Sequence, residues 1–437
     1  MTSILIYCPN PTPRHDYIFE LFFRMLLGVD YSYTPNVNEA MVNYSHEKNE
    51  SFHIVPYGLL DEFSIRTDIL DEISFETSKM ITAFFKTVGG SCQFDLFSAA
   101  FFLVSRYEEY LPFSLDNHRR FPAEASVLFK NNMLEEPLIN QWAIFIRQEL
   151  TTNFEISFPK KKFTYLSTID IDQAWKYKYK GIIRNTLGLV RDVIRVNISE
   201  IRERIKVFLG IISDPYFNFK WQNEFHLSLK TQVIYFILLG KYGSYDKNIK
   251  PSNPHFISLI KDLDSLSYAR LGIHPSYVSN SNPIQLSKEY QNLNTIISGS
   301  ITMSRQHYLI HAMPYTYRQL IKLGIKEDFT LGYSTHIGFR AGIASSFYWF
   351  DLIENIKTDL LLTPFCIMDI TPMYYRSETP EIAKKTIESL LNKVQAVDGM
   401  FVSLWHNESL SETDRWKGWR SVYVHLNKLA NDIIFSE

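Results

Sequence analysis

From residue 165 to residue 406 the sequence alternates short apolar runs typical of β-strands with longer segments of helical periodicity. Residues 232–239, 269–273, 333–339 and 400–405 are strand-like runs, and residues 317–323 and 380–394 are helical segments between such runs. Strands that alternate with helices favour a parallel sheet or a (β/α) barrel. This pattern therefore constrains the second part of the chain to an α/β fold.

One strand-like run ends at residues 167–172 and places two carboxylates, Asp170 and Asp172, two positions apart. Because successive side chains of a strand point to opposite faces, both acids lie on the same face. Two close carboxylates repel each other unless a cation neutralises one or one stays protonated. The pair therefore suits a metal ligand beside a general base.

Polar side chains follow most of these apolar runs at the predicted carboxyl ends of the strands. In (β/α) barrels this face carries the active site. Twelve histidines scattered at random would match the pattern once or twice, so its regularity predicts a site built from these residues: His274, Arg305, His307, Arg340, Asp369 and His406.

The length of 437 residues favours two domains. We expect a smaller α/β domain over residues 1–155 and an α/β barrel over 160–437, joined by the basic spacer 159–162. A net charge of −2 gives no global attraction to nucleic acid or to an anionic membrane.

Three cysteines, Cys8, Cys92 and Cys366, lie far apart without metal-type spacing, which fits a reducing compartment. The N-terminus lacks the basic segment of a signal peptide, and no run is long enough to cross a membrane. We therefore expect a soluble, cytoplasmic protein.

The first domain is predicted to contain strands at 4–7 and 52–55 and helices at 17–27 and 95–111. Three charged residues stand at the end of the last helix: Arg106, Glu108 and Glu109. We interpret them as structural ion pairs at a domain boundary, in preference to a functional cluster.

A mostly helical insertion is predicted at 173–225, and its first part is rich in basic residues. This part is interpreted as a solvated helix face, because acids dilute its charge. The alternative is an electropositive rim for an anionic glycan or a lipid headgroup.

Asp172, His274 and a further histidine would form a two-histidine, one-carboxylate set with open positions on a zinc-like ion. Such a metal lowers the pKa of bound water to about 7 and polarises a carbonyl oxygen. Asp170 would then act as the base, with Arg340 as its neighbouring arginine, and His406 would protonate the leaving group. This chemistry is metal-assisted hydrolysis of an acyl bond.

Four segments resemble the ordered motifs of the polysaccharide deacetylases, the carbohydrate esterase family 4 or NodB-homology enzymes: 167–172, 272–277, 338–342 and 404–407. The resemblance covers about residues 160–437 and implies a distorted (β/α) barrel. It also implies a hydrolase that uses a divalent metal, zinc in the first place, to remove an N-acetyl group from a sugar or glycan intermediate.

The resemblance implies a role for each matching residue. Asp170 corresponds to the catalytic base and His406 to the catalytic acid, whereas Asp172 and His274 correspond to metal ligands. The remaining matches are an arginine that orients the base, an acid that supports this arginine, and an apolar wall for the acetyl methyl: Arg340, Asp369 and Trp405.

One position departs from the family pattern, because Val278 stands where a second histidine is usual. We hypothesise that His307 supplies the third ligand, and that Arg305 and Tyr277 border the substrate. Two alternatives stay open: a catalytically reduced barrel that binds a glycan, and a hydrolase of a small linear amide. The sequence does not assign the sugar or the oligomeric state.

Overall fold

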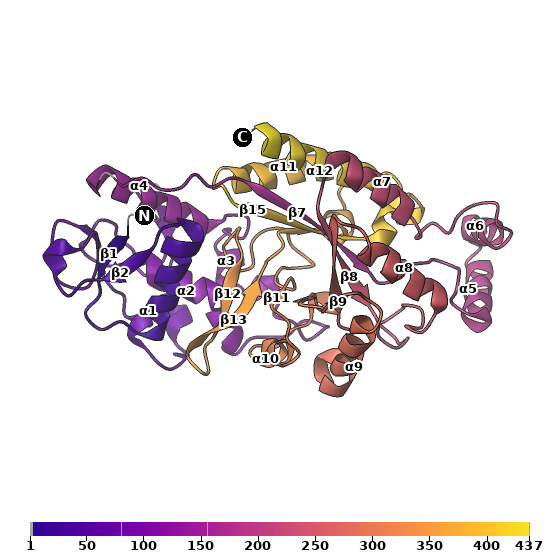
Figure 1. Cartoon of the computed structure of the whole chain (residues 1–437), viewed down its shortest axis with the longest axis horizontal. Helices are drawn as coiled ribbons and strands as arrows, with labels where there is room; N and C mark the ends of the chain where they lie inside the picture. The colour runs from indigo at the N-terminus through magenta and orange to yellow at the C-terminus, as the bar shows by residue number, and fades with distance from the viewer. Residues whose placement is uncertain (1–2, 80, 155, 437) are drawn as a thin grey trace.

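The computed structural model describes residues 3–79, 81–154 and 156–436. Figure 1 shows an elongated molecule with the first residues of the chain at one end and helices α5 (Ile182–Ile194) and α6 (Ile198–Phe208) projecting at the other. A mainly parallel sheet surrounded by helices lies between the two ends. The chain is thus a mixed α/β protein, as the alternating pattern predicts.

A small parallel sheet lies near the N-terminus, and in the described residues its strand order is β2-β1-β3-β4. The predicted strands at 4–7 and 52–55 are confirmed. The strands of this region, including a hairpin that follows the sheet, are β1 (Ile4–Tyr7), β2 (Tyr31–Tyr33), β3 (Val42–Tyr44), β4 (Phe52–Ile54), β5 (Glu76–Ser78) and β6 (Ile81–Ala83).

Helix α2 (Leu96–Val104) is buried along its whole length, which explains why its sequence is apolar on every side. The predicted helix at 95–111 ends early, because Arg106 adopts a left-handed backbone with φ of +55°. The other predicted helix, at 17–27, is split into α1 (Pro13–Phe19) and a π-helical stretch, Glu20–Leu26. Helices α3 (Val127–Lys130) and α4 (Leu138–Phe154) complete this part.

The large sheet has the strand order β12-β13-β11-β10-β9-β8-β7-β15-β14 within the described residues. All neighbouring pairs are parallel except β12 with β13. Its strands are β7 (Thr164–Ile171), β8 (Val233–Leu238), β9 (Ala269–His274), β10 (Met303–Ser304), β11 (Glu327–Asp328), β12 (Phe347–Asp351), β13 (Ile356–Leu362), β14 (Ile367–Met368) and β15 (Met400–His406).

Helices cover the outside of the large sheet. The helical segments predicted at 317–323 and 380–394 are confirmed as α10 and α11. Strand ladders in the described residues do not join β12 to β14, so the hydrogen bonds alone define no closed barrel. The helices around the sheet are α7 (Phe219–Leu229), α8 (Pro254–Asp264), α9 (Pro283–Asn294), α10 (Tyr315–Lys322), α11 (Pro380–Gln395) and α12 (Trp419–Ser436).

The strand predicted at 333–339 is wrong, because this segment forms turns. Gly338 has a φ of +116°, and a Cβ there would lie 2.2 Å from the carbonyl oxygen of Leu134. The next residue, Phe339, donates its backbone N–H to that same carbonyl at 2.6 Å. A close backbone approach between the two halves of the chain therefore replaces strand pairing at this place.

The insertion is helical as predicted, with α5 and α6 inside 173–225 and α7 beginning at its end and running on to Leu229. The interpretation as a solvated helix face holds for its exposure, but many of the exposed residues of α5 and α6 are aliphatic. The acids that were expected to dilute the basic charge on the surface instead point inward, as Asp192 and Glu200 do.

The described ranges 3–79, 81–154 and 156–436 contain no helix long and apolar enough to cross a membrane. The three cysteines are buried free thiols, as expected from their spacing.

The structural ion pairs predicted at the end of the apolar helix are confirmed, and they reach across the chain. Arg106 pairs with Glu108 and Glu109 at 2.8 Å, and Arg340 makes a bidentate contact with Glu109 at 2.8 and 2.9 Å. Burial favours the neutral acid, but Arg340 and Arg106 outweigh it and hold the pKa of Glu109 well below its usual range. This buried cluster ties residues 106–109 to the segment between β11 and β12 that carries Arg340.

Replacing Glu109 by Ala is expected to lower the free energy of unfolding by about 3–5 kcal/mol, because two buried guanidinium groups lose their partner. Chemical denaturation measures the change. Glu381→Ala removes an exposed carboxylate that pairs with Lys384 and serves as the control. Equal, small changes in both variants would show that the cluster does not hold the halves together.

Candidate metal centre and active site

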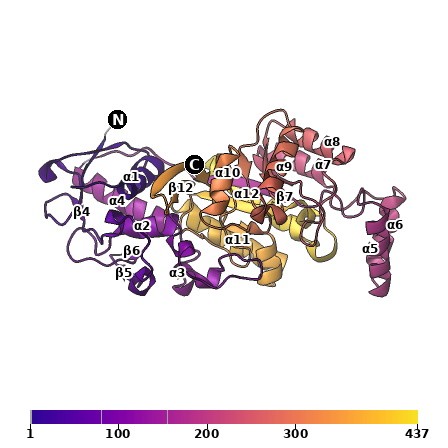
Figure 2. The ribbon, with the colours of Figure 1, turned by 90° about the horizontal axis from the view of Figure 1, so that it is seen from below.

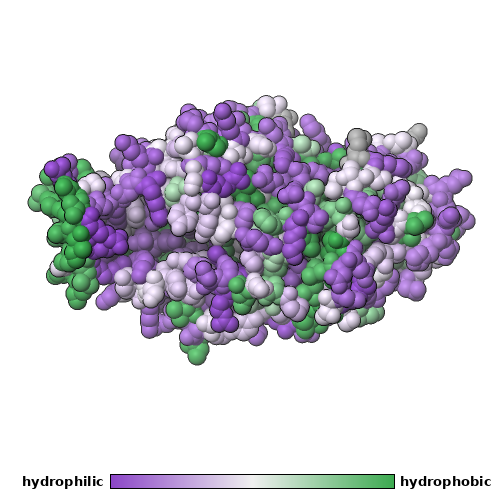
Figure 3. Space-filling view, turned by 180° about the vertical axis from the view of Figure 1, so that it is seen from behind, coloured by the Kyte–Doolittle hydropathy of each residue, from purple (hydrophilic) through white to green (hydrophobic). Residues whose placement is uncertain are grey.

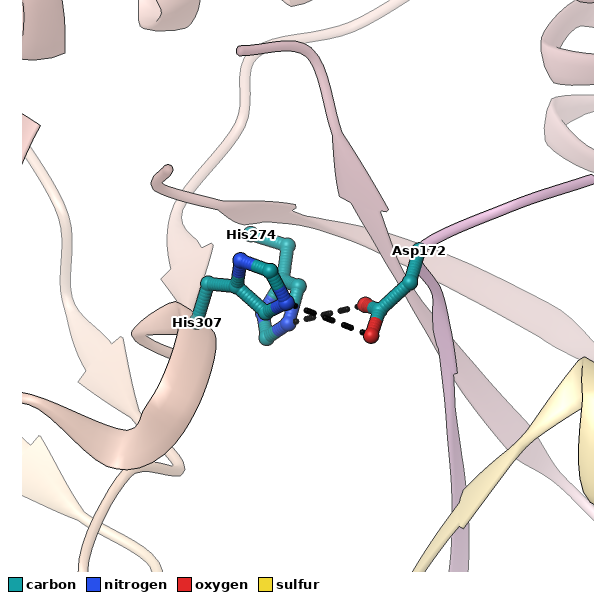
Figure 4. A group of neighbouring side chains, drawn as sticks. All are labelled: Asp172, His274 and His307. Atoms are coloured by element: carbon teal, nitrogen blue, oxygen red, sulfur yellow. Dashed lines mark hydrogen bonds and ion pairs between the residues drawn. The ribbon is translucent and has the colours of Figure 1, made fainter. Parts of the chain in front are cut away.

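The carboxyl ends of the parallel strands bring an aspartate and two histidines together (Figure 4). Asp172 follows β7, His274 ends β9, and His307 follows β10. The two carboxylate oxygens of Asp172 face His274 Nε2 at 3.3 Å and His307 Nε2 at 3.2 Å. One ligand atom from each residue lies within 4.8 Å of the others. The hypothesis that His307 joins Asp172 and His274 is thus met by the geometry.

Each histidine is oriented by a hydrogen bond on the far side of its ring. His274 Nδ1 donates to the carbonyl oxygen of Arg305 at 2.6 Å, and His307 Nδ1 donates to Asp246 at 2.8 Å. If such a ring is neutral, its proton is on Nδ1 and its Nε2 lone pair points at the carboxylate of Asp172, so that two hydrogen-bond acceptors face each other. That arrangement requires a proton or a cation between them. Such outer partners are characteristic of metal-binding histidines.

Charge in the group is consistent with a site for a cation. Burial disfavours a charged His307, but Asp172 and Asp246 outweigh it and raise its pKa to about 9. Burial also favours a neutral Asp172, but His307 and His274 hold its pKa well below the usual range. Within the described part of the chain, the buried Oδ1 atom of Asp172 lacks a hydrogen-bond donor. Two imidazoles and one carboxylate are a donor set that suits zinc and related divalent ions.

Asp170 is buried beside this group, with Oδ2 3.6 Å from His274 Nε2. Its arginine partner is Arg305, whose Nη1 donates to Oδ1 at 2.9 Å, and not the expected Arg340. Arg340 follows the turn segment described above and binds Glu109 instead. Arg305 is fully buried with its guanidinium 4.5 Å from the ring of Phe236, so its expected role as a substrate contact is wrong.

His406, at the end of β15, lies on the other side of Asp172, with Nε2 3.9 Å from Oδ2. Its Nδ1 contacts Asp369 at 3.0 Å, and Asp369 also accepts the backbone N–H of His406 at 2.8 Å. Asp369 therefore supports His406 and not the expected Arg340. Burial disfavours the imidazolium, but the Asp369 carboxylate outweighs it and raises the pKa of His406 to about 10.

A cavity of about 270 Å³ opens over these side chains. It is lined by the acid pair and by the three histidines, and also by His118 and Arg120 from the first part of the chain. Arg120 donates to the carbonyl oxygen of Tyr308 at 2.7 Å, which places its loop against the mouth. No spacing or motif in the sequence singles out His118, Arg120 or Asp246, the hydrogen-bond partner of His307.

Two other predicted substrate contacts lie behind the cavity wall. Trp405 is buried and packs on Tyr423 at 5.1 Å, whereas the preceding Leu404 lines the cavity, because side chains alternate along β15. Tyr277 stacks on Tyr245 at 4.1 Å, and Tyr245 is the ring that lines the cavity.

Val278, which replaces the usual histidine, is 54% exposed in a short turn after His274. It does not border the cavity as the described residues form it. The third ligand position is therefore filled from another strand.

Comparisons with known proteins add little to this geometry. A family model described as "Family of unknown function (DUF7033)" matches residues 4–155. A search of curated proteins found no match. A solved structure described as "putative polysaccharide deacetylase from Mycobacterium smegmatis" is similar with a TM-score of 0.40 and 12% identity, over 64% of this chain and 93% of that chain. At this TM-score, the likeness decides neither the fold nor the activity of this chain.

The His307→Ala variant is expected to lose divalent-metal affinity by more than a hundredfold, because it removes a ligand. Asp246→Asn is expected to lose about 10–100-fold, because it keeps the ligand and only weakens the hydrogen bond that orients the ring of His307. Competition with a chromogenic chelator measures both values.

Val278→His serves as the matched control, and it should bind metal no more tightly than the wild type. Tighter binding by this variant, or unchanged binding by His307→Ala, would contradict the Asp172, His274 and His307 assignment.

Proposed function

We propose that this chain is a metal-dependent hydrolase that removes an N-acetyl or related acyl group from a sugar or a glycan intermediate. The observation that carries this proposal is the position of Asp170 and His406 next to the Asp172, His274 and His307 group in one cavity. A base, an acid and a candidate metal centre are the parts that metal-assisted acyl hydrolysis needs.

Asp172, His274 and His307 would hold the divalent ion, zinc in the first place. When bound, the ion supplies Lewis acidity to an acyl oxygen and to a water. The histidines would offer the ion their Nε2 atoms, because Asp246 and the Arg305 carbonyl engage both Nδ1 atoms.

Asp170 is the proposed proton acceptor for the attacking water. Arg305 donates to its Oδ1 atom, so Oδ2, on the side of His274, remains to accept the proton. Thr168 Oγ1 also accepts from Arg305 Nη1 at 2.8 Å and helps to fix the guanidinium. This pairing takes the place of the arginine that the motifs assign to position 340.

His406 is the proposed acid that protonates the leaving amine. Asp369 binds its Nδ1 atom, which directs Nε2 towards the cavity, and the raised pKa keeps the ring protonated at neutral pH. Proton transfer from Nε2 to the amine nitrogen allows the C–N bond to break without expelling an amide anion.

The alternative of a barrel that only binds glycan rested on a missing third metal ligand. The position of His307 beside Asp172 and His274 argues against this alternative. The rings of Tyr245 and Tyr308 at the cavity favour a sugar substrate, since sugars stack on aromatic faces, whereas a small linear amide gains nothing from them.

The proposed fold is a distorted (β/α) barrel over 160–437, preceded by a domain over 1–155. Support for closure comes from residues 363–366, which join β13 on one flank of the sheet to β14 on the other. Along this link Thr363 donates to the carbonyl of Asp328, and Cys366 donates to that of Val402. The buried free thiols favour a cytoplasmic setting.

Asp170→Asn is expected to lower kcat by at least about a thousandfold and to leave bound metal unchanged, because it removes the base and keeps the shape. Acetate release from N-acetylglucosamine oligomers, measured with elemental analysis of the same sample, tests this. Loss of metal together with loss of activity would show that Asp170 is the metal ligand and Asp172 the base. Full activity would show that Asp170 takes no part in the mechanism.

Arg120→Ala is expected to raise KM several-fold with a smaller effect on kcat, because Arg120 holds the loop of the first domain at the cavity mouth. Arg119→Ala removes an exposed charge from the same loop and should leave both constants unchanged. If both variants behave like the wild type, the first domain does not shape the site.

A further inference from the structure

Helices α5 and α6 form an arm, residues 180–212, that stands clear of the rest of the molecule (Figure 2). It begins soon after Asp172, so it is an insertion next to the candidate metal centre. The proposed hydrolase chemistry uses none of its residues.

The acidic residues of the arm are turned inward. Asp192 is 3% exposed and accepts from Arg204 at 2.6 Å. Glu200 is 9% exposed and accepts from Lys176 at 2.7 Å and from Tyr177 at 2.6 Å. The two helices thus meet the protein through polar contacts, the reverse of an ordinary amphipathic surface helix.

The outward face is correspondingly aliphatic. Ile183, Leu187, Val190 and Ile194 follow helical spacing along α5 and are 75%, 65%, 49% and 75% exposed. Figure 3 shows the resulting hydrophobic end of the molecule. An exposed patch of this kind marks a surface that binds an apolar partner. Its continuation on and after α6 consists of Ile198, Ile205, Phe208, Leu209, Ile211 and Ile212.

The charge that the arm does expose is positive. Residues 180–212 contain seven basic and three acidic residues, a net charge of +4 in a chain of net charge −2. All three acids, Glu203 included, are engaged by the inward contacts above. The basic side chains that remain exposed are Arg191, Arg195, Arg202 and Lys206.

We propose that this arm binds the surface of a lipid bilayer that contains anionic lipids. A bilayer offers apolar chains beneath negative headgroups, which matches aliphatic side chains flanked by arginine and lysine. A second copy of the chain would present the same positive charge and be repelled. The sequence-based exclusion of an anionic membrane, drawn from the net charge of the whole chain, does not hold for this segment.

The arm is fixed to the part of the chain that forms the cavity. Asp214 accepts the backbone N–H groups of Lys176, Tyr177 and Lys178 at 2.7–3.0 Å. Arg184 donates to the carbonyl oxygen of Lys247, a cavity residue, at 2.7 Å. Membrane binding would therefore hold the cavity mouth beside the bilayer, where a lipid-linked or membrane-associated substrate is reached.

Flotation of the full-length protein with vesicles of phosphatidylcholine, with and without about 30 mol% phosphatidylglycerol, tests the proposal. We expect binding only to the anionic vesicles, weakened by added salt. The combined change Ile183→Ser, Leu187→Ser and Ile194→Ser should reduce the partition coefficient at least about tenfold, because the aliphatic groups that enter the interface are lost.

The matched control replaces three exposed isoleucines elsewhere, Ile284, Ile353 and Ile382, by Ser, and it should bind like the wild type. His274→Ala should also bind, which separates this proposal from the hydrolase. Failure of the wild type to float, or equal flotation of the arm variant, would overturn the proposal. So would a concentration-dependent dimer in sedimentation that the arm variant abolishes, because the face would then bind a second copy.

Discussion

The carboxylate of Asp172 faces the Nε2 atoms of two imidazoles whose Nδ1 atoms are hydrogen-bonded on the opposite sides of their rings, and the rest of the site depends on this contact. The Arg305 carbonyl and Asp246 hold the rings so that both Nε2 atoms converge on Asp172. Such convergence of acceptors is stable only with positive charge among them. The group is therefore organised for a cation before one binds.

The large sheet makes this convergence possible by bringing strand ends from distant parts of the chain to one edge. Each ligand is supported from a different segment. Arg305, after β10, binds Asp170 with its side chain and orients His274 with its carbonyl, and Asp246, after β8, orients His307. β14 and β15 likewise deliver Asp369 and His406 as a pair. Because each support comes from a different strand end than its ligand, the geometry depends on the parallel pairing that brings these ends to one edge.

The strand ends were predictable from sequence, because periodicity and a terminal Asp or His mark them locally, as at Asp170, Asp172 and His274. The hydrogen-bonding and ion-pair partner of each side chain was not predictable from sequence. Arg340 and Arg305 follow equally plausible segments, and only the turn at Gly338 directs Arg340 to Glu109. The exposed aliphatic face of α5 was missed for a similar reason, since sequence shows which residues share a helix face but not which face the protein covers.

The assignment of Asp172, His274 and His307 as metal ligands is tested most directly by anomalous diffraction at the zinc edge from crystals of the wild-type protein grown with zinc. We predict one strong anomalous peak within bonding distance of Asp172 and of the Nε2 atoms of His274 and His307, beside Asp170. Zinc bound elsewhere, with these three side chains hydrogen-bonded only to one another, would contradict it.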